Sequence, residues 1–148
     1  STLVWNILAK KNDKNIEDSV LKTIAAFNNQ KGGTLLIGVN DDGEVLGLNK
    51  DFEFGGLKNV DKFERKLRSI LKSRLKGTGD YLSKQIKVSF PEWQKNKEIC
   101  RVDVSKGSKP LYTKEEKLFT REGNSTVAVP LSETHQYVEN HFKKRKTR

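Results

Sequence analysis

A short, continuous apolar run at residues 34–39 does most to limit what this chain can fold into. Its sequence, Thr-Leu-Leu-Ile-Gly-Val, is typical of a buried strand. Two glycines at 32–33 separate it from a helical pattern over residues 16–29, and tandem glycines permit a left-handed exit from a helix. The turn sequence Asn-Asp-Asp-Gly follows, and residues 44–48 are predicted to pair back as the second arm of a hairpin. A helix that leads into a hairpin indicates a mixture of helices and antiparallel strands.

The rest of the chain continues this pattern. It predicts a second helix at 58–76, a second hairpin from 85–90 and 98–105, extended pieces at 109–112 and 118–121, and a last helix from Ser132 towards Phe142. We therefore expect an α+β fold: a single mixed domain with a hairpin-bearing sheet and about three helices. The 148 residues suit one domain. We assign residues 1–142 to it and residues 143–148 to a basic tail or linker stub.

Positive charge is concentrated in two places. The formal net charge is +10, of which residues 58–76 contribute +6 (eight basic and two acidic side chains) and residues 143–148 contribute +5. Basic domains bind nucleic acid, anionic membranes or acidic proteins. No stretch approaches 18 consecutive apolar residues and no signal peptide is visible, so we expect a cytoplasmic protein without a membrane partner.

The segment at 58–76 is predicted to be an amphipathic helix. Apolar residues recur at helical spacing and define a core-facing side, while basic residues occupy the opposite side. That basic side is either a solvated helix face or a phosphate-facing ridge. On the second interpretation, the candidate nucleic-acid contacts are Lys58, Lys62, Arg65, Lys66, Arg68, Lys72 and Lys76.

Further candidate contacts lie in two connections. Trp93, beside two lysines in a polar connection, is a candidate to stack on an unpaired base. Residues 121–126 are predicted to be a polar loop after a strand, where Arg121, Ser125 and Thr126 can hold a phosphate. The alternative is that these side chains anchor the loop to its own backbone.

Other motifs favour structural roles. The Gln-Lys-Gly-Gly sequence at 30–33 follows a helix and precedes a strand, whereas a phosphate-binding loop opens a helix, so we interpret it as a helix end. Asp41 and Asp42 fit the turn at which they lie better than a cation site. Cys100 falls in a predicted strand and is expected in the core. No catalytic constellation stands out in the sequence.

A series of motifs in fixed order resembles the Schlafen AlbA domain. They lie at 21–29, 32–39, 41–43 with 47–48, 100–104, 109–112 and 119–126. The resemblance extends from Trp5 to about Phe142. It implies a mixed α/β fold with two hairpin-bearing lobes and a role in nucleic-acid binding. Bacterial domains of this kind are often the N-terminal part of larger transcriptional regulators or helicase-like proteins.

The resemblance also implies a candidate catalytic residue. Related domains of vertebrate Schlafens include a metal-dependent RNA endonuclease with two Glu and one Asp. Only the Asp carries over, as Asp41, which is therefore the candidate catalytic residue and metal ligand. The Glu-containing segment would lie just before Ser1, so we expect an excised domain that lacks it. Mg²⁺ or Mn²⁺ is implied only if the parent protein is a nuclease, and catalysis by this chain itself is not expected.

The favoured function is therefore nucleic-acid binding, with DNA or RNA as the partner. The alternatives are a metal-dependent RNA endonuclease in a longer parent, with Asp41 as one ligand, and an ATP-binding or protein-interaction module. In the last case the basic helix would contact an acidic partner. The sequence leaves the oligomeric state open, including a homodimer.

Overall fold

The computed structural model describes the chain in several segments. They are residues 5–6, 11–12, 14–39, 47–48, 59–77, 79–94 and 97–142, with the backbone alone at 5–6, 11–12, 14–16, 93–94 and 97. The fold is a mixed α+β domain, as the sequence predicted.

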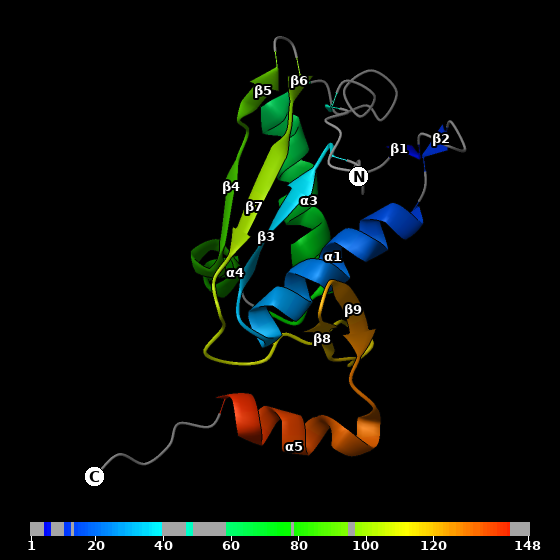
Figure 1. Ribbon diagram of the computed structural model, residues 1–148, viewed down its shortest axis with the longest axis vertical. Helices are drawn as coiled ribbons and strands as arrows, with labels where there is room; N and C mark the ends of the chain where they lie inside the picture. The colour runs from blue at the N-terminus through cyan, green and yellow to red at the C-terminus, as the bar shows by residue number, and fades with distance from the viewer. Residues whose placement is uncertain are drawn as a thin grey trace.

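The central element is a three-stranded antiparallel sheet. Its strand order is β3 (Gly33–Ile37), β7 (Cys100–Val104) and β4 (Ile86–Ser89), so β7 lies in the middle (Figure 1). In the register, Val102 lies opposite Leu35 on one side and Val88 on the other. The predicted antiparallel pairing of the segments around 85–90 and 98–105 is thus confirmed.

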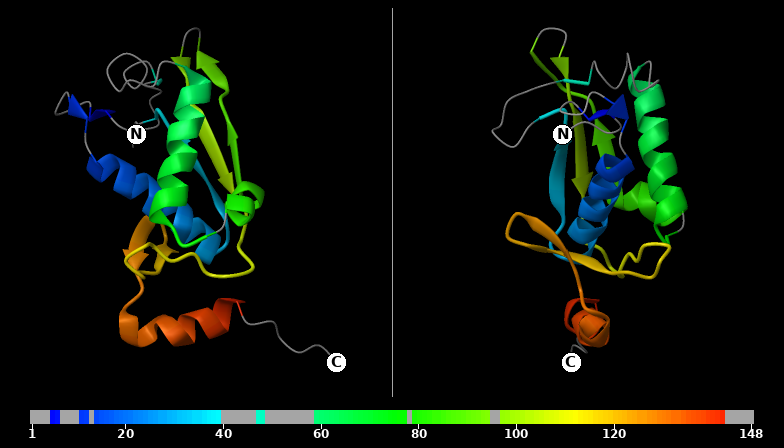
Figure 2. Two further views of the ribbon diagram at one scale, coloured as in Figure 1. Left: turned by 180° about the vertical axis from the view of Figure 1, so that it is seen from behind. Right: turned by 90° about the vertical axis from the view of Figure 1, so that its right-hand side faces the viewer.

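Two helices cover one face of this sheet. α1 (Lys14–Asn29) and α3 (Val60–Arg74) lie on the same side of it (Figure 2). The apolar stripe predicted on α3 is buried here, because its side chains pack against α1 and the inward side chains of the strands. This core includes Leu21, Ile24, Ile37, Phe63, Leu67, Leu71, Ile86, Cys100 and Val102.

The opposite face of the sheet is largely polar, although Leu36 of β3 is also exposed on it. Alternation along the strands places Thr34, Lys87 and Arg101 on this side, all exposed, together with half-buried Asp103. The Thr34 hydroxyl donates a hydrogen bond of 2.7 Å to Asp103. That bond, with a smaller contribution from Arg101, holds the pKa of Asp103 below its usual value. The sheet therefore has one buried and one largely polar face, as is common for antiparallel sheets.

Smaller elements complete the fold. A short helix α4 (Gly79–Gln85) precedes β4, and β5 (Glu92–Gln94) pairs with β6 (Lys97–Glu98). β8 (Phe119–Glu122) and β9 (Ser125–Ala128) form a hairpin beside α1, and α5 (Leu131–Phe142) follows. Two strands of two residues, β1 (Trp5–Asn6) and β2 (Lys11–Asn12), pair near the start of the chain.

Two parts of this arrangement differ from the sequence predictions. No helix was predicted between the basic helix at 58–76 and the strand at 85–90, but Gly79 begins α4 there, so the described residues contain four helices rather than about three. Ser125 and Thr126 were expected in a loop, but they begin β9, because the turn of the hairpin is confined to Gly123 and Asn124. Gly123 adopts a left-handed φ of 60° there, which a turn of this kind requires.

The helix end at residues 30–33 is confirmed. Gly32 has a φ of 79°, and its N–H donates to the carbonyl oxygen of Phe27 at 2.7 Å. A Cβ atom on Gly32 would lie 2.6 Å from the carbonyl oxygen of Val104, so a side chain is excluded by contact as well as by φ. Most of the predicted second arm at 44–48 lies outside the described residues, although Gly47 N–H bonds the Gly38 carbonyl oxygen at 3.0 Å.

The last helix lies at the margin of the fold. α5 has no buried residue, and Leu131 at its start is 89% exposed. Tyr137 of α5 is half-buried and hydrogen-bonds the end of α1. Figure 1 shows α5 beyond the β8–β9 hairpin, away from the sheet. The predicted helix is therefore present, but its packing is looser than expected.

Candidate nucleic-acid interface

The basic helix α3 begins and ends with clear local signals. Asn59 is its N-cap, and its side chain accepts a hydrogen bond of 2.9 Å from the backbone N–H of Lys62. Asp61 lies in the first turn, whereas Lys72 and Arg74 lie in the last, which suits the helix dipole. The buried apolar stripe fixes the rotation of α3, so its basic side chains face outward.

Several of these basic side chains are paired with carboxylates. Lys66 lies 3.7 Å from Glu17 of α1, and Arg68 lies 2.8 Å from Glu64. Arg74 does not lie on the basic side of α3, and it forms an ion pair with Asp18 of α1. These pairs reduce the positive charge that α3 can offer to a phosphate.

Lys76, just after α3, is also paired. Its Nζ lies 2.6 Å from a carboxylate oxygen of Glu116, in the turn between residues 113 and 117. The hydrogen bond from Lys76 holds the pKa of Glu116 below its usual value. Both groups are exposed, so water screens the pair and its contribution to stability is small.

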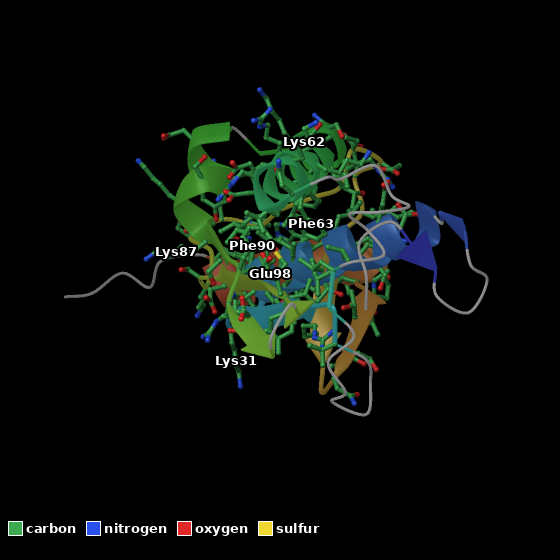
Figure 3. The ribbon with its side chains drawn as sticks, turned by 90° about the horizontal axis from the view of Figure 1, so that it is seen from above. Lys31, Lys62, Phe63, Lys87, Phe90 and Glu98 are labelled. Carbon is green, nitrogen blue, oxygen red and sulfur yellow. The ribbon has the colours of Figure 1, made fainter. Side chains whose placement is uncertain are left out.

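Three cations of α3 have no ion-pair partner within the described part of the chain. Lys62, Arg65 and Lys72 are exposed, and we call them the α3 ridge. Figure 3 shows Lys62 pointing away from the molecule, whereas Phe63, its neighbour, points towards Phe90 in the core. At 1.5 Å per residue the ridge extends over about 15 Å of the helix. Arg65 and Lys72 line an open depression with Asp61, Glu64, Arg68 and Ser69.

The remaining candidates from the sequence fall into two groups. Asp41, Lys58 and the tail at 143–148 lie outside the described residues, and so does the side chain of Trp93, whose backbone belongs to β5. Arg121, Ser125 and Thr126 are described, on the β8–β9 hairpin. The predictions for the first group stay predictions.

Arg121 and Thr126 are held together across the hairpin. Arg121 Nη1 donates a hydrogen bond of 2.9 Å to Thr126 Oγ1, which lies 3.2 Å from Thr23 Oγ1 of α1. The Arg121 guanidinium also lies over the ring of Phe27, 5.2 Å from its centroid. Ser125 is exposed on the neighbouring position of β9. Arg121 is thus anchored by side-chain contacts to β9 and α1, and its predicted phosphate contact stays a prediction.

The α3 ridge and Arg121 do not form one surface. α1 lies between α3 and the β8–β9 hairpin, whose turn projects on the side away from α3 (Figure 2). Lys31, close to Arg121 in the fold, likewise lies opposite Lys62 when the molecule is seen from above (Figure 3). The candidate contacts predicted on the basic helix and at Arg121 therefore lie on two different sides of the fold.

Comparison with known proteins identifies the family. A family model described as Schlafen, AlbA_2 matches residues 6–130. The chain belongs to the Schlafen AlbA_2 family. This AlbA_2 domain is also similar to the crystal structure of the DIP2311 protein from Corynebacterium diphtheriae, with a TM-score of 0.59 and 19% sequence identity. That similarity shows the fold alone.

The extent of the match differs between the two chains. It covers 88% of this chain but 23% of the DIP2311 chain, which is therefore much longer. None of the curated proteins matches the AlbA_2 domain.

Two buried asparagines organise the side of this AlbA_2 domain that carries Arg121. Asn28 and Asn29, at the end of α1, are 0% and 1% exposed. Asn29 Nδ2 donates to the carbonyl oxygens of Leu111 and Phe119 at 3.0 and 2.9 Å, and Asn29 Oδ1 accepts from the Leu111 N–H at 2.8 Å. These bonds fix β8, and thereby Arg121, against α1.

Asn28 extends this network to the segment before β8. Its Nδ2 donates to the carbonyl oxygen of Lys109 at 3.0 Å, and its Oδ1 accepts from the Tyr81 hydroxyl at 2.9 Å. Neither asparagine was a candidate from the sequence, because polar residues at a helix end are ordinary. Their place at the end of the motif at 21–29 was the signal that could have indicated them.

No group of three or more His, Cys, Asp and Glu side chains in the described segments could hold a metal ion. Asp41 lies outside those segments, so this finding does not test its predicted role as a metal ligand. Among the described helices of the AlbA_2 domain, none has both the length and the apolar character needed to cross a bilayer.

We expect the single cysteine to be unreactive in the folded domain. Cys100 is fully buried, and burial raises the pKa of its thiol to about 12. Because the thiolate is the reactive form, labelling by iodoacetamide at pH 8 should be slow in the native protein and fast in denaturant. Mass spectrometry after timed labelling measures both rates. Equal rates in the two states would contradict the buried position.

Proposed function

We propose that this domain binds the phosphate backbone of DNA or RNA through the α3 ridge. Membership of the AlbA_2 family supports a nucleic-acid-related domain. The observation that carries the proposal is the set of three exposed cations, Lys62, Arg65 and Lys72, that have no carboxylate partner in the described segments. Cations of this kind release counterions when they contact phosphates, which favours binding.

We propose that the charges of the α3 ridge position a nucleic-acid strand on the domain. α3 is fixed by its buried stripe, so the ridge presents its three charges along a rigid helix. Contacts to phosphates place a nucleic acid on the protein but do not read its sequence. We therefore infer weak sequence preference and strong dependence on salt. A longer DNA-binding regulator, as the sequence resemblance implies, would use the domain in this way.

Removing the ridge should weaken binding and reduce its salt dependence. We expect replacement of Lys62, Arg65 and Lys72 by alanine to lower affinity for a labelled 20-nucleotide strand roughly tenfold or more at low salt. The slope of log K against log salt should become less steep by about 2 for a single strand, at about 0.7 per phosphate contact. Fluorescence anisotropy titrations at several salt concentrations measure both quantities, with DNA and RNA compared.

A charge-matched control separates the ridge from net charge. Lys87, Lys106 and Lys114 are exposed, lie outside α3 and have no ion pair among the described residues. Their replacement by alanine removes the same charge and should change the slope by less than 1. Equal losses in the two triple variants, or binding by the wild type that is indifferent to salt, would contradict the proposal.

A further inference from the structure

A small hollow lies between the end of α1 and the turn of the β8–β9 hairpin. Its volume is about 300 Å³, at the lower limit for a small-molecule site. It is lined by Phe27, Gln30, Lys31, Gly32, Arg121 and Gly123, with no carboxylate among them. A neighbouring hollow that shares Gln30 and Arg121 differs in this respect, because Glu122 and Glu133 line it. We call the first one the Arg121 hollow.

The polar side chains of the Arg121 hollow present hydrogen-bond donors. Arg121 and Lys31 are cations, and neither has an ion-pair partner in the described segments. Gln30 Oε1 accepts a hydrogen bond of 3.3 Å from the Thr120 hydroxyl and lies 2.9 Å from the hydroxyl of Tyr137, whose single proton it shares with the Asn29 carbonyl oxygen. The amide of Gln30 is therefore oriented with its NH₂ group, a double donor, away from those hydroxyls. A group with several acceptor oxygens is the complement of this set.

Arg121 is held in place before any ligand arrives. It uses one N–H towards Thr126 and lies over the Phe27 ring, so most of its five donors remain for another partner. β8, from which it projects, is tied to α1 by Asn29. A guanidinium fixed in this way loses little side-chain entropy on binding, which favours recognition of oxyanions.

We propose that the Arg121 hollow binds a phosphate monoester. A monoester carries about −1.5 to −2 charge at pH 7 and three acceptor oxygens, whereas a backbone phosphodiester carries one negative charge. Two cations and an amide donor without a carboxylate match the monoester. The group occurs at the phosphorylated end of a nucleic-acid strand and in a free mononucleotide. Because the hollow and the α3 ridge lie on different sides of α1, this proposal does not depend on strand binding by the ridge.

The wild-type experiment compares ligands that differ only in the monoester. Three labelled 12-nucleotide strands carry a 5′-phosphate, a 3′-phosphate or hydroxyls at both ends, and AMP is compared with adenosine by calorimetry. We expect at least one monoester ligand to bind about tenfold more tightly than its hydroxyl counterpart. A factor of this size corresponds to the free energy that one hydrogen bond to a charged group contributes. Preference for a strand end identifies that source, and preference for AMP alone identifies the mononucleotide. No preference in any pair overturns the proposal.

Variants of the hollow test the assignment to its residues. Lys31 is exposed, so the Lys31→Glu variant should fold normally and should lose the monoester preference. The control variant Lys87→Glu, on the polar face of the sheet, should keep that preference. Arg121→Gln should also abolish the preference, with circular dichroism to check folding, since Arg121 packs on Phe27. The triple variant of the α3 ridge should weaken all three strands equally and keep the preference. A preference that survives both Lys31→Glu and Arg121→Gln overturns the proposal, whatever the outcome for the ridge.

Discussion

Asn29→Ala should destabilise the domain by about 4 kcal/mol, because it leaves several buried backbone groups without partners. The side chain satisfies the N–H and the carbonyl oxygen of Leu111 and the carbonyl oxygen of Phe119, all from segments more than 80 residues away. Each buried group left unpaired costs about 1–3 kcal/mol. Since domains of this size are stable by about 5–15 kcal/mol, the variant should be close to unfolding.

Urea unfolding followed by circular dichroism measures this loss. Asn29→Asp is an informative second variant, because it keeps the shape but places an acceptor against two carbonyl oxygens, and it should cost at least as much. Asn124→Ala, on the exposed turn of the β8–β9 hairpin, is the matched control and should change stability by less than about 0.5 kcal/mol. Asn29→Ala with wild-type stability would show that the network is not energetically important.

Phe63→Ala is expected to cost about 3–5 kcal/mol through the loss of core packing. Phe63 is 0% exposed, and its ring meets that of Phe90 edge to face, with centroids 5.8 Å apart. Removing the ring loses its transfer free energy and leaves a cavity between α3 and the sheet. Because Phe63 helps to fix the rotation of α3, the variant should also weaken nucleic-acid binding, although it removes no charge.

The same unfolding measurement compares Phe63→Ala with Leu131→Ala. Leu131 is 89% exposed, so its truncation removes a large apolar side chain without opening a cavity, and stability should change little. A loss of less than 1 kcal/mol for Phe63→Ala would argue that the core around α3 can collapse and that the helix is not rigidly placed.

Periodicity in the sequence was sufficient for the elements of the core. The stripe that contains Phe63 and Leu67 predicted both the helix and its buried side, and alternation around Val88 and Val102 predicted two strands that pair. Periodicity failed where glycines and short polar residues are compatible with more than one kind of element. Gly79 begins a short helix that was not predicted, and the polar character of Ser125 and Thr126 concealed a strand.

The candidate site was less predictable, because its properties depend on contacts between distant segments. The basic side of α3 was correctly located, but the sequence could not indicate that Arg74 would pair with Asp18, or Lys66 with Glu17. Nor could it indicate that Arg121 and Lys31 would line one hollow. Composition gives the number of charged residues, whereas the fold determines which of them form ion pairs and which lie on the same surface.

The loose packing of α5 has a consequence for how the domain unfolds. A helix without a buried residue can leave the body of the protein without exposing the core, so its opening is separate from global unfolding. Tyr137 opposes that opening, since its hydroxyl reaches the Asn29 carbonyl oxygen and the Gln30 side chain at the end of α1. The family match ends at residue 130, one residue before α5 begins. We therefore expect α5 to open before the rest of the fold, which would place the boundary of the cooperative unit close to the end of the family match.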